Sequence, residues 1–407
     1  MRHVILGAGP AGLAALASIR RNDAGARITL VSGEPGLPYS RMALPYYVNG
    51  DLPSRHLYPH PALWYRQPGV ELRWGEPGEA LDVERREVTL AGGERLPFDR
   101  LLVATGSRAQ LREAPGIHLP QVQLLWTLGD ARRLRRRANG ASEVVIWGAG
   151  MIAFMTAKAL LTAGRRVHFI CRAEYLLRRS LDQEAAFLLE GALEQAGAVL
   201  HRGLNLAEIR SGPGRRCRVL LTDGSELPAD LVVVALGVAP NLDWLDDAPV
   251  QRRQGLLVNE RLETSAAGIF AAGDVAEVRD CVTGESGVPA LWSVATDQGR
   301  VAGLNMTGAT LVCDPALRSN TMVFHDYVVA TLGCPLVREN TRVYRRLDRE
   351  RRVYRCLVLS GGRLVGAILA GDVSQVGFLR SVIRRGAVLT DPEGLLGTPP
   401  LPGGVRP

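Results

Sequence analysis

Val4-Ile5-Leu6-Gly7-Ala8-Gly9-Pro10-Ala11-Gly12 is the first indication of the fold. In this stretch an apolar strand runs directly into a glycine-rich turn. The residues behind it, LAALASIRR, have the spacing of a helix. The same arrangement returns at Val145-Ile146-Trp147-Gly148-Ala149-Gly150-Met151-Ile152-Ala153, followed by the helical stretch FMTAKALLTAG. A second apolar strand follows each unit, RITLVS at 27–32 and RVHFIC at 166–171. The chain therefore contains two β–α–β units that are built alike.

The glycines in this pattern have separate physical tasks. Gly7 allows the tight turn out of the strand, Gly9 leaves room for a pyrophosphate beside the backbone, and Gly12 lets the helix pack closely. The amides and the dipole of the helix N-terminus then face the phosphates. A single copy could be an ordinary glycine turn, but the repetition argues against that. The expected dinucleotide-binding residues are Gly7, Gly9, Pro10, Ala11 and Gly12 in the first copy, and Gly148, Gly150, Met151 and Ile152 in the second.

A second pair of matching segments supports the duplication. DRLLVATG at 99–106 matches DLVVVALG at 230–237, and each follows a polar turn and a short strand. Since both pairs occur in the same order, the sequence predicts an α/β protein with two Rossmann-like dinucleotide-binding domains. Ala104, Thr105, Gly106 and, in the second copy, Gly237 are expected close to the bound nucleotides.

A third signature lies at 264–274, where the short strand of TSAAGIFAAGD ends in Gly273-Asp274. Such a loop lets a carboxylate reach the ribityl chain of a flavin, while the glycine lets the backbone pass. The helix expected from about Ala290-Leu291-Trp292 would point its N-terminus at the flavin pyrimidine and stabilise negative charge there. A turn or helix-capping aspartate is the alternative for Asp274, but the two preceding nucleotide motifs favour the flavin.

The order GAGPAG, ATG, GAG, LG, AAGD resembles the pyridine nucleotide–disulfide oxidoreductase family over about residues 1–310. The segment EPGLPYSRMALPYY at 34–47 is similar to the branch of ferredoxin and rubredoxin reductases and the flavin module of NADH-dependent nitrite reductases. Residues 355–383 resemble the small C-terminal domain of that branch. The resemblance implies FAD in the first domain, NADH or NADPH in the second, and hydride transfer between their stacked rings.

This organisation places an FAD domain at 1–113 and 248–315, an NAD(P)H domain at 114–247, and a small α+β C-terminal domain at 316–407. The strand VYRCLVLS and the turn Gly361-Gly362 predict a hairpin in the last domain. In related proteins a fuller version of this domain forms a dimer interface, so a homodimer or a subunit of a complex is an open expectation. The Pro- and Gly-rich end TPPLPGGVRP at 398–407 is expected to be disordered.

One departure from the family concerns sulfur chemistry. MALPYY at 42–47 also resembles the CGLPYY stretch of coenzyme A-disulfide reductases, so Met42 occupies the position of the redox cysteine. A thioether forms neither a thiolate nor a disulfide, and electrons would then leave reduced FAD directly. Nearby, Glu34 is the first acid available for the FAD ribose, although it could be an exposed loop residue. Arg41 is a candidate to neutralise the pyrophosphate, with a structural ion pair as the alternative.

A second departure lies in the nucleotide domain. At the end of the strand 166–171 the family usually has a ribose-binding glutamate, whereas this chain has Cys171 followed by Arg172. Loss of the carboxylate removes a repulsion against a 2′-phosphate, and Arg172 could pair with one, which favours NADPH over NADH. Met155 stands where the family often has a glutamate near the nicotinamide. A degenerate site that binds no nicotinamide is therefore a second hypothesis.

Composition limits the partners. The net charge is +8, yet only one of the 49 basic residues is a lysine, so genomic bias and a basic face for an acidic partner both remain open. The basic run RRLRRR at 132–137 is expected on a solvated helix face, and no nucleic-acid motif is found. The absence of a signal peptide and of a membrane-spanning apolar run favours the cytoplasm. The six cysteines show no metal-site spacing.

Two functions follow from these patterns. The first is an FAD-dependent NAD(P)H oxidoreductase that passes electrons to an acidic redox protein of the ferredoxin or rubredoxin type, a quinone or another acceptor. The second is an FAD-carrying electron-transfer subunit of a larger dehydrogenase. The intact second glycine turn favours the first function, while Cys171 and Met155 keep the second in consideration.

Overall fold

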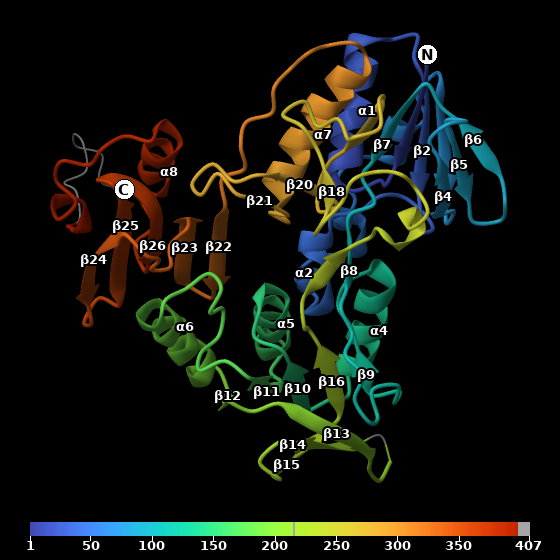
Figure 1. The fold of residues 1–407 in the computed structure, drawn as a ribbon. Coiled ribbons are helices and arrows are strands. Elements are labelled where there is room, and N and C mark those ends of the chain that lie inside the picture. Colours follow the sequence, from blue (N-terminus) through green and yellow to red (C-terminus); the bar gives the residue numbers. More distant parts are fainter. Residues whose placement is uncertain (215, 398–407) are drawn as a thin grey trace.

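The computed structural model describes residues 1–214 and 216–397, and the expected disorder of 398–407 lies outside them. The first domain is built on a parallel sheet in the order β19-β7-β1-β2-β3 (Figure 1). Its strands are β1 (Arg2–Leu6), β2 (Arg27–Ser32), β3 (Val70–Trp74), β7 (Arg100–Val103) and β19 (Ile269–Ala271). The sheet thus combines strands from both ends of the first 271 residues, as an interrupted domain requires.

The two faces of this sheet are covered differently. Helices α1 (Pro10–Asn22) and α7 (Trp292–Met306) pack on one face, where Ile5, Leu30 and Leu102 are buried. On the other face, Leu6 and Val103 pack against the antiparallel strands β4 (Gly78–Asp82), β5 (Glu87–Leu90) and β6 (Arg95–Pro97). Successive residues of a central strand enter opposite cores, which explains why these strands are continuously apolar.

The second domain repeats this plan. Its parallel sheet has the order β12-β11-β10-β16-β9, with α4 (Leu128–Ala138), α5 (Met151–Thr162) and α6 (Gln183–Gln195) packed in one core. The other face is covered by β13 (Leu206–Ser211), β14 (Cys217–Leu221) and β15 (Glu226–Ala229). The five sheet strands are β9 (Val122–Gln123), β10 (Glu143–Trp147), β11 (Arg166–Cys171), β12 (Ala198–Arg202) and β16 (Leu231–Val234). The predicted duplication of Rossmann-like domains is confirmed.

Short elements connect the two large domains. The antiparallel pair β8 (Ser107–Ala109) and β17 (Val238–Pro240) carries the chain across in both directions. In the first domain, η1 (Arg41–Ala43) leads into α2 (Leu44–Val48), which contacts both α4 and α5 of the second. Further pieces are η2 (Ser54–Leu57), α3 (Ala62–Tyr65), η3 (Asp243–Leu245), β18 (Leu256–Leu257), β20 (Ala276–Arg279) and β21 (Ser286–Gly287).

The C-terminal domain is a five-stranded antiparallel sheet in the order β22-β23-β26-β25-β24, with α8 (Val376–Arg385) on one face. Its other face packs against α6 of the second domain and joins the same core. The strands are β22 (Ser319–Phe324), β23 (Tyr327–Gly333), β24 (Thr341–Asp348), β25 (Val353–Ser360) and β26 (Arg363–Ala370), and η4 (Gly394–Leu396) follows. The hairpin predicted around Gly361-Gly362 is present as β25–β26.

Candidate functional site

The first glycine turn has the geometry of a phosphate cradle. Gly7 has a φ of +115°, and a Cβ there would lie 1.9 Å from the carbonyl oxygen of Ala104. A Cβ at Gly12 would lie 1.8 Å from the oxygen of Gly7, whereas one at Gly9 would meet nothing within 4 Å. Pro10 and Ala11 open α1, whose N-cap residue Gly9 supplies no side-chain hydrogen bond. The turn is therefore closed on its inner side and open beside Gly9, where free amides could receive phosphate.

The second glycine turn likewise has a closed inner side and an open side. Gly148 has a φ of +142°, and a Cβ there would come within 2.2 Å of the oxygen of Ala235. A Cβ at Gly150 would meet nothing within 4 Å, and this residue caps α5 without a side-chain bond. Met151 and Ile152, half-buried, form the first residues of that helix. The residues present in both turns thus fit a dinucleotide pyrophosphate.

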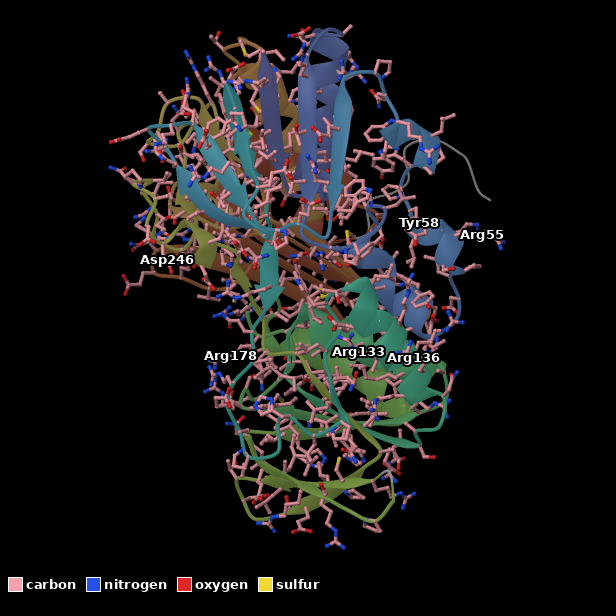
Figure 2. All side chains as sticks on the ribbon, turned by 90° about the vertical axis from the view of Figure 1, so that its right-hand side faces the viewer. Arg55, Tyr58, Arg133, Arg136, Arg178 and Asp246 are labelled. Atoms are coloured by element: carbon pink, nitrogen blue, oxygen red, sulfur yellow. The ribbon has the colours of Figure 1, made fainter. Side chains whose placement is uncertain are left out.

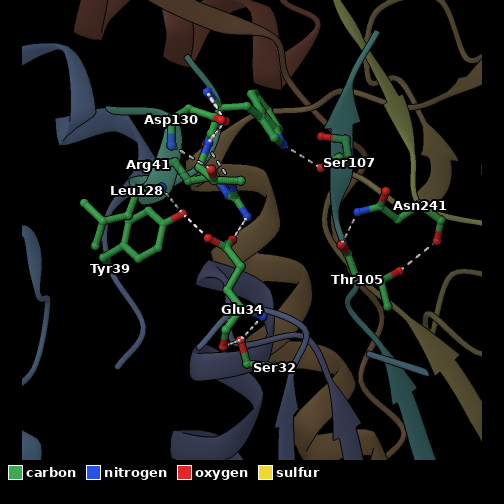
Figure 3. Close-up of polar contacts among 11 residues, drawn as sticks. Ser32, Glu34, Tyr39, Arg41, Thr105, Ser107, Leu128, Asp130 and Asn241 are labelled. Atoms are coloured by element: carbon green, nitrogen blue, oxygen red, sulfur yellow. Dashed lines mark hydrogen bonds and ion pairs between the residues drawn. The ribbon is translucent and has the colours of Figure 1, made fainter. Parts of the chain in front are cut away.

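A polar network joins the first domain to the start of α4 (Figure 3). The Arg41 guanidinium forms an ion pair with Glu34 and donates a hydrogen bond to the carbonyl oxygen of Trp126. The Tyr39 hydroxyl donates to Glu34 Oε2 at 2.6 Å and accepts from the amide of Leu128 at 2.8 Å. Burial raises the pKa of Tyr39, so the hydroxyl keeps its proton. Glu34, predicted to bind the FAD ribose, and Arg41, predicted to neutralise the pyrophosphate, therefore contact each other, and this is also the ion pair that was the alternative for Arg41.

A second bond connects the sequence signatures at 104–106 and 273–274. The Ser107 hydroxyl donates to Asp274 Oδ2 at 2.8 Å, and the amide of Gly273 donates to Gln298 Oε1 at 2.7 Å from α7. Burial raises the pKa of the Asp274 carboxyl, against the Ser107 bond and the charge of Arg41. The carboxylate is thus held on the loop between β19 and β20, facing the side of the site that carries Arg41.

Helix α7 lies very close to α1 behind this loop. A Cβ at Gly299 would lie 2.0 Å from the oxygen of Ala11, and one at Gly303 would lie 2.7 Å from the oxygen of Ala15. The helix begins at Trp292, after Ala290 with a φ of +47°, and no side chain caps it. Its N-terminus is therefore available to stabilise negative charge, as the sequence predicts.

The domain crossing is held by reciprocal bonds between two loops. The Thr105 hydroxyl donates to the carbonyl oxygen of Asn241 at 3.0 Å, and the Asn241 amide donates to the oxygen of Thr105 at 2.9 Å. Gly106 and Gly237 both have positive φ values and accept backbone bonds from Asn241 and Gln110. A Cβ at Gly7 would meet Ala104 and one at Gly148 would meet Ala235, so the loops that lead into the crossing strands lie beside the two nucleotide turns.

The end of β11 carries the residues expected to read the nucleotide ribose. Cys171 is buried, and burial, with the charge of Glu190, raises its pKa to about 11. Arg172 is exposed, and Met155 is half-buried against the core that contains Tyr39 and Tyr47. The strand end therefore offers a neutral thiol followed by a solvent-facing guanidinium, with no carboxylate at these two positions.

The cysteine thiols of the chain are protonated at neutral pH. All six cysteines are unpaired, and burial raises the pKa of each, to about 11 for Cys171, Cys217, Cys281, Cys313 and Cys356. In η1 the side chain of Met42 is 61% exposed. No thiolate is therefore available at neutral pH for a relay.

Several residues of the site were not predicted from the sequence. Ser107, Trp126 and Gln298 hold the loops that carry Arg41, Gly273 and Asp274. Ser107 could have been suspected because it directly follows Ala104-Thr105-Gly106. Trp126 and Gln298 carry no local signal for this role, since Trp126 accepts from Arg41, 85 positions away, and Gln298 accepts from Gly273, 25 positions away.

Comparison with known proteins identifies the family. Residues 1–299 match the pyridine nucleotide-disulphide oxidoreductase family, and residues 319–387 match the rubredoxin NAD+ reductase C-terminal domain. The chain belongs to the pyridine nucleotide-disulphide oxidoreductases. This oxidoreductase therefore uses FAD and NADH or NADPH, and the branch expected from its sequence is confirmed.

Its relatives are named for different reactions. The oxidoreductase is 31% identical over 392 residues to the epsilon subunit of NADH-dependent phenylglyoxylate dehydrogenase from Aromatoleum evansii, covering 96% of this chain and 93% of that one. It is 28% identical over 379 residues to NADH-rubredoxin oxidoreductase from Clostridium acetobutylicum, covering 91% of each. The solved ferredoxin reductase from Rhodopseudomonas palustris matches with a TM-score of 0.87 at 28% identity over 95% of both chains.

Among the described residues, no helix is both long and apolar enough to cross a membrane.

Proposed function

We propose that this oxidoreductase takes a hydride from NADPH onto FAD and delivers the electrons directly to an acceptor protein, without a cysteine relay. In the balanced reaction, NADPH and two oxidised one-electron acceptors give NADP+, a proton and two reduced acceptors. The observation that carries the proposal is the combination of two open glycine cradles with six protonated thiols and a methionine at position 42.

The assignment of residues follows the geometry. We assign 1–113 and 248–315 to FAD and 114–247 to NADPH. The FAD cradle would comprise Gly7, Gly9, Pro10, Ala11, Gly12, Glu34, Arg41, Ala104, Thr105, Gly106, Gly273, Asp274 and Trp292. The NADPH cradle would comprise Gly148, Gly150, Met151, Ile152, Arg172 and Gly237. Bound FAD supplies a site that accepts a hydride and releases electrons singly or in pairs. The protein's own part is to hold both nucleotides with open amides and to present Arg41 and Asp274 on the same side of the first cradle.

The preference for NADPH rests on charge. Cys171 offers no carboxylate to repel a 2′-phosphate, and Arg172 is exposed immediately after it. Arg178 is also exposed in the loop that follows β11, and the amide of Leu177 in that loop bonds to Ala149 of the second glycine turn. Arg179 and Glu174 in the same loop are exposed too, so three guanidinium groups against one carboxylate lie beside the cradle and suit a doubly charged phosphate. Figure 2 shows Arg178 pointing out from the second domain.

A redox protein as the acceptor is supported by the relatives, which include reductases named for rubredoxin and ferredoxin. A second candidate is a subunit of a larger dehydrogenase, because the Aromatoleum evansii subunit matches almost the whole chain. We expect either a homodimer or a subunit of a complex, and the six free thiols suit the reducing cytoplasm.

The test is anaerobic absorbance of the purified flavoprotein at about 450 nm, before and after adding NADH or NADPH. Rapid bleaching by NADPH, with at least about tenfold weaker affinity for NADH, is expected. A flavin that dithionite bleaches and neither nucleotide bleaches would favour the dehydrogenase subunit. Treatment with iodoacetamide at neutral pH should leave acceptor reduction unchanged, and loss of most activity on alkylation would contradict direct transfer from the flavin.

A further inference from the structure

Helix α4 presents an unusually basic surface. Arg132, Arg133, Arg136 and Arg137 are all exposed, and their spacing places them on one side of the helix. Arg55 of η2 is exposed as well, and α2 contacts both η2 and α4. We call these five residues the basic face. Figure 2 shows Arg55 and Tyr58 on the same side of the molecule as Arg133 and Arg136.

The charges on the basic face are almost entirely unpaired. Within residues 1–214 and 216–397, Arg133 is the one member with an ion-pair partner, Asp130. That carboxylate is buried and also caps the helix by accepting from the amide of Thr127. Two like-charged pairs at i,i+4 disfavour the helix, although arginines in its last turn interact well with the dipole. A genomic preference explains arginine instead of lysine, but not five arginines in six positions with no exposed acid among them.

The basic face lies beside the flavin-binding loop. The first turn of α4 is bonded to that loop through the oxygen of Trp126 and the amide of Leu128. Further along, the Arg135 guanidinium lies over the ring of Tyr47 in α2, 4.7 Å from its centroid. From Leu128 to Arg136 the helix advances about 12 Å. The arginines of the basic face on α4 therefore lie about 6–14 Å along the helix axis from its contact with Tyr39, in the loop that also carries Arg41 and Met42.

We propose that the basic face is the docking surface for an acidic redox protein that receives electrons from this flavoenzyme. The inference rests on the proposed function, and it adds the place and the charge of the partner. Opposite charges around an electron-exit site speed the encounter and orient the partner more than they strengthen the final complex. Arginine is also well suited to carboxylate-rich surfaces because its guanidinium forms paired hydrogen bonds.

The test compares two charge reversals of equal size in the FAD-loaded full chain. The first is R132E/R136E on the basic face. The control is R342E/R346E on the edge strand β24, where both arginines are exposed and have no ion pair within the described residues. The acceptors are a rubredoxin of net negative charge and an uncharged quinone, with NADPH as donor. The rate constant kcat/KM is measured at low ionic strength and at about 0.5 M salt, where exposed charges are screened.

The expected result is a loss of at least about tenfold in kcat/KM for rubredoxin in R132E/R136E at low salt, with a much weaker salt dependence. The control should stay within about twofold of the wild type, and quinone reduction should not change in either variant. Equal effects of both reversals on rubredoxin would overturn the docking surface. Reduction of quinone but not of rubredoxin by the wild type would also overturn it, while leaving the flavoenzyme intact. If neither acceptor is reduced, the proposed function fails as well.

Discussion

At the scale of single residues, the glycines of each nucleotide turn divide into those that the fold needs and those that the ligand needs. Gly7 and Gly148 have positive φ values and face a carbonyl oxygen, so any side chain there disturbs the backbone. Gly9 and Gly150 have φ values of −79° and −91°, which alanine adopts freely, and their missing Cβ atoms would point into open space. We therefore expect the second pair to serve the phosphate rather than the turn.

This division gives a prediction for two matched variants. Gly9→Ala should purify with little flavin, and Gly150→Ala should retain flavin but raise the KM for NADPH by about tenfold, because the methyl group occupies the phosphate space. Neither change should lower the melting temperature of the ligand-free protein. The checks are flavin absorbance, steady-state kinetics and thermal unfolding. A fall in ligand-free stability in both variants would show that these positions are structural.

His3 gives a prediction about acid stability. It lies in the middle of the first sheet at 1% exposure, and neither ring nitrogen has a hydrogen-bond partner among the described residues. Burial, together with the charge of the N-terminus, lowers its pKa from 6.5 to about 4. The unfolded chain therefore binds the proton first, so stability is complete above about pH 6.5 and declines as the pH falls toward 4.

Between pH 7 and pH 4, the free energy of unfolding of the His3→Leu variant should fall by about 2 kcal/mol less than that of the wild type. This figure is reduced for residual solvent screening of the imidazole. The measurement is urea unfolding of both proteins between pH 7 and pH 4, compared by difference. His118→Gln, which replaces an exposed imidazole, is the control and should follow the wild type. Parallel curves for His3→Leu and the wild type would assign the acid sensitivity to other groups.

At the scale of elements, the contact between α1 and α7 carries the first site. Both helices start at loops that are expected to hold FAD, and Gly299 and Gly303 let their backbones approach without intervening side chains. This pairing makes the loop at Gly273-Asp274 and the turn at Gly9 parts of one rigid unit. Glycine lowers the intrinsic stability of the helix at both positions, since only proline is a weaker helix former.

Identical substitutions in two helices should therefore have opposite effects. Gly299→Ala places a Cβ 2.0 Å from the oxygen of Ala11, and we expect a loss of about 2–3 kcal/mol together with most of the bound flavin. Gly191→Ala in α6 meets nothing within 4 Å and should stabilise by about 0.5–1 kcal/mol. Denaturant unfolding with flavin quantification tests both, and a stable, yellow Gly299→Ala protein would refute the close contact.

At the scale of the whole molecule, function depends on how two domains of similar construction face each other. The crossing strands β8 and β17 are the covalent link, and the Thr105–Asn241 bonds hold their loops together. Helix α2 of the first domain also contacts the second domain, because Tyr47 lies against Arg135 of α4 and Tyr46 against Lys158 of α5. Hydride transfer needs the two nucleotides in stacking register, so small errors in domain orientation are costly to the rate.

Asn241→Ala should lower the rate of flavin reduction by NADPH about tenfold, while flavin content and NADPH affinity change little. Stopped-flow absorbance under anaerobic conditions separates the two quantities. Asn22→Ala is a matched control, since it breaks a side-chain bond to Thr307 within the first domain only. An unchanged rate in Asn241→Ala would mean that other contacts fix the domain orientation.

The local structural motifs of this protein could be predicted from its amino-acid sequence. Strand–glycine–helix units at 4–12 and 145–153 were readable because each turn forces a backbone conformation that depends on its own few residues. Their repetition predicted the two domains, and the hairpin at 353–370 followed from alternation and a Gly-Gly turn. The methionine at position 42, where the resemblance places the redox cysteine, was equally visible, since the identity of a side chain needs no fold to be known.

Which of these motifs contact each other is known from the folded structure alone. Ser107 is 167 positions from Asp274, and Arg41 is 85 positions from Trp126, yet each pair forms a hydrogen bond. The sequence also located the arginines of α4 without showing that they lie beside the flavin loop. Contacts of this kind depend on how whole sheets and helices pack, and that packing is fixed by the summed burial of many apolar residues rather than by any short pattern.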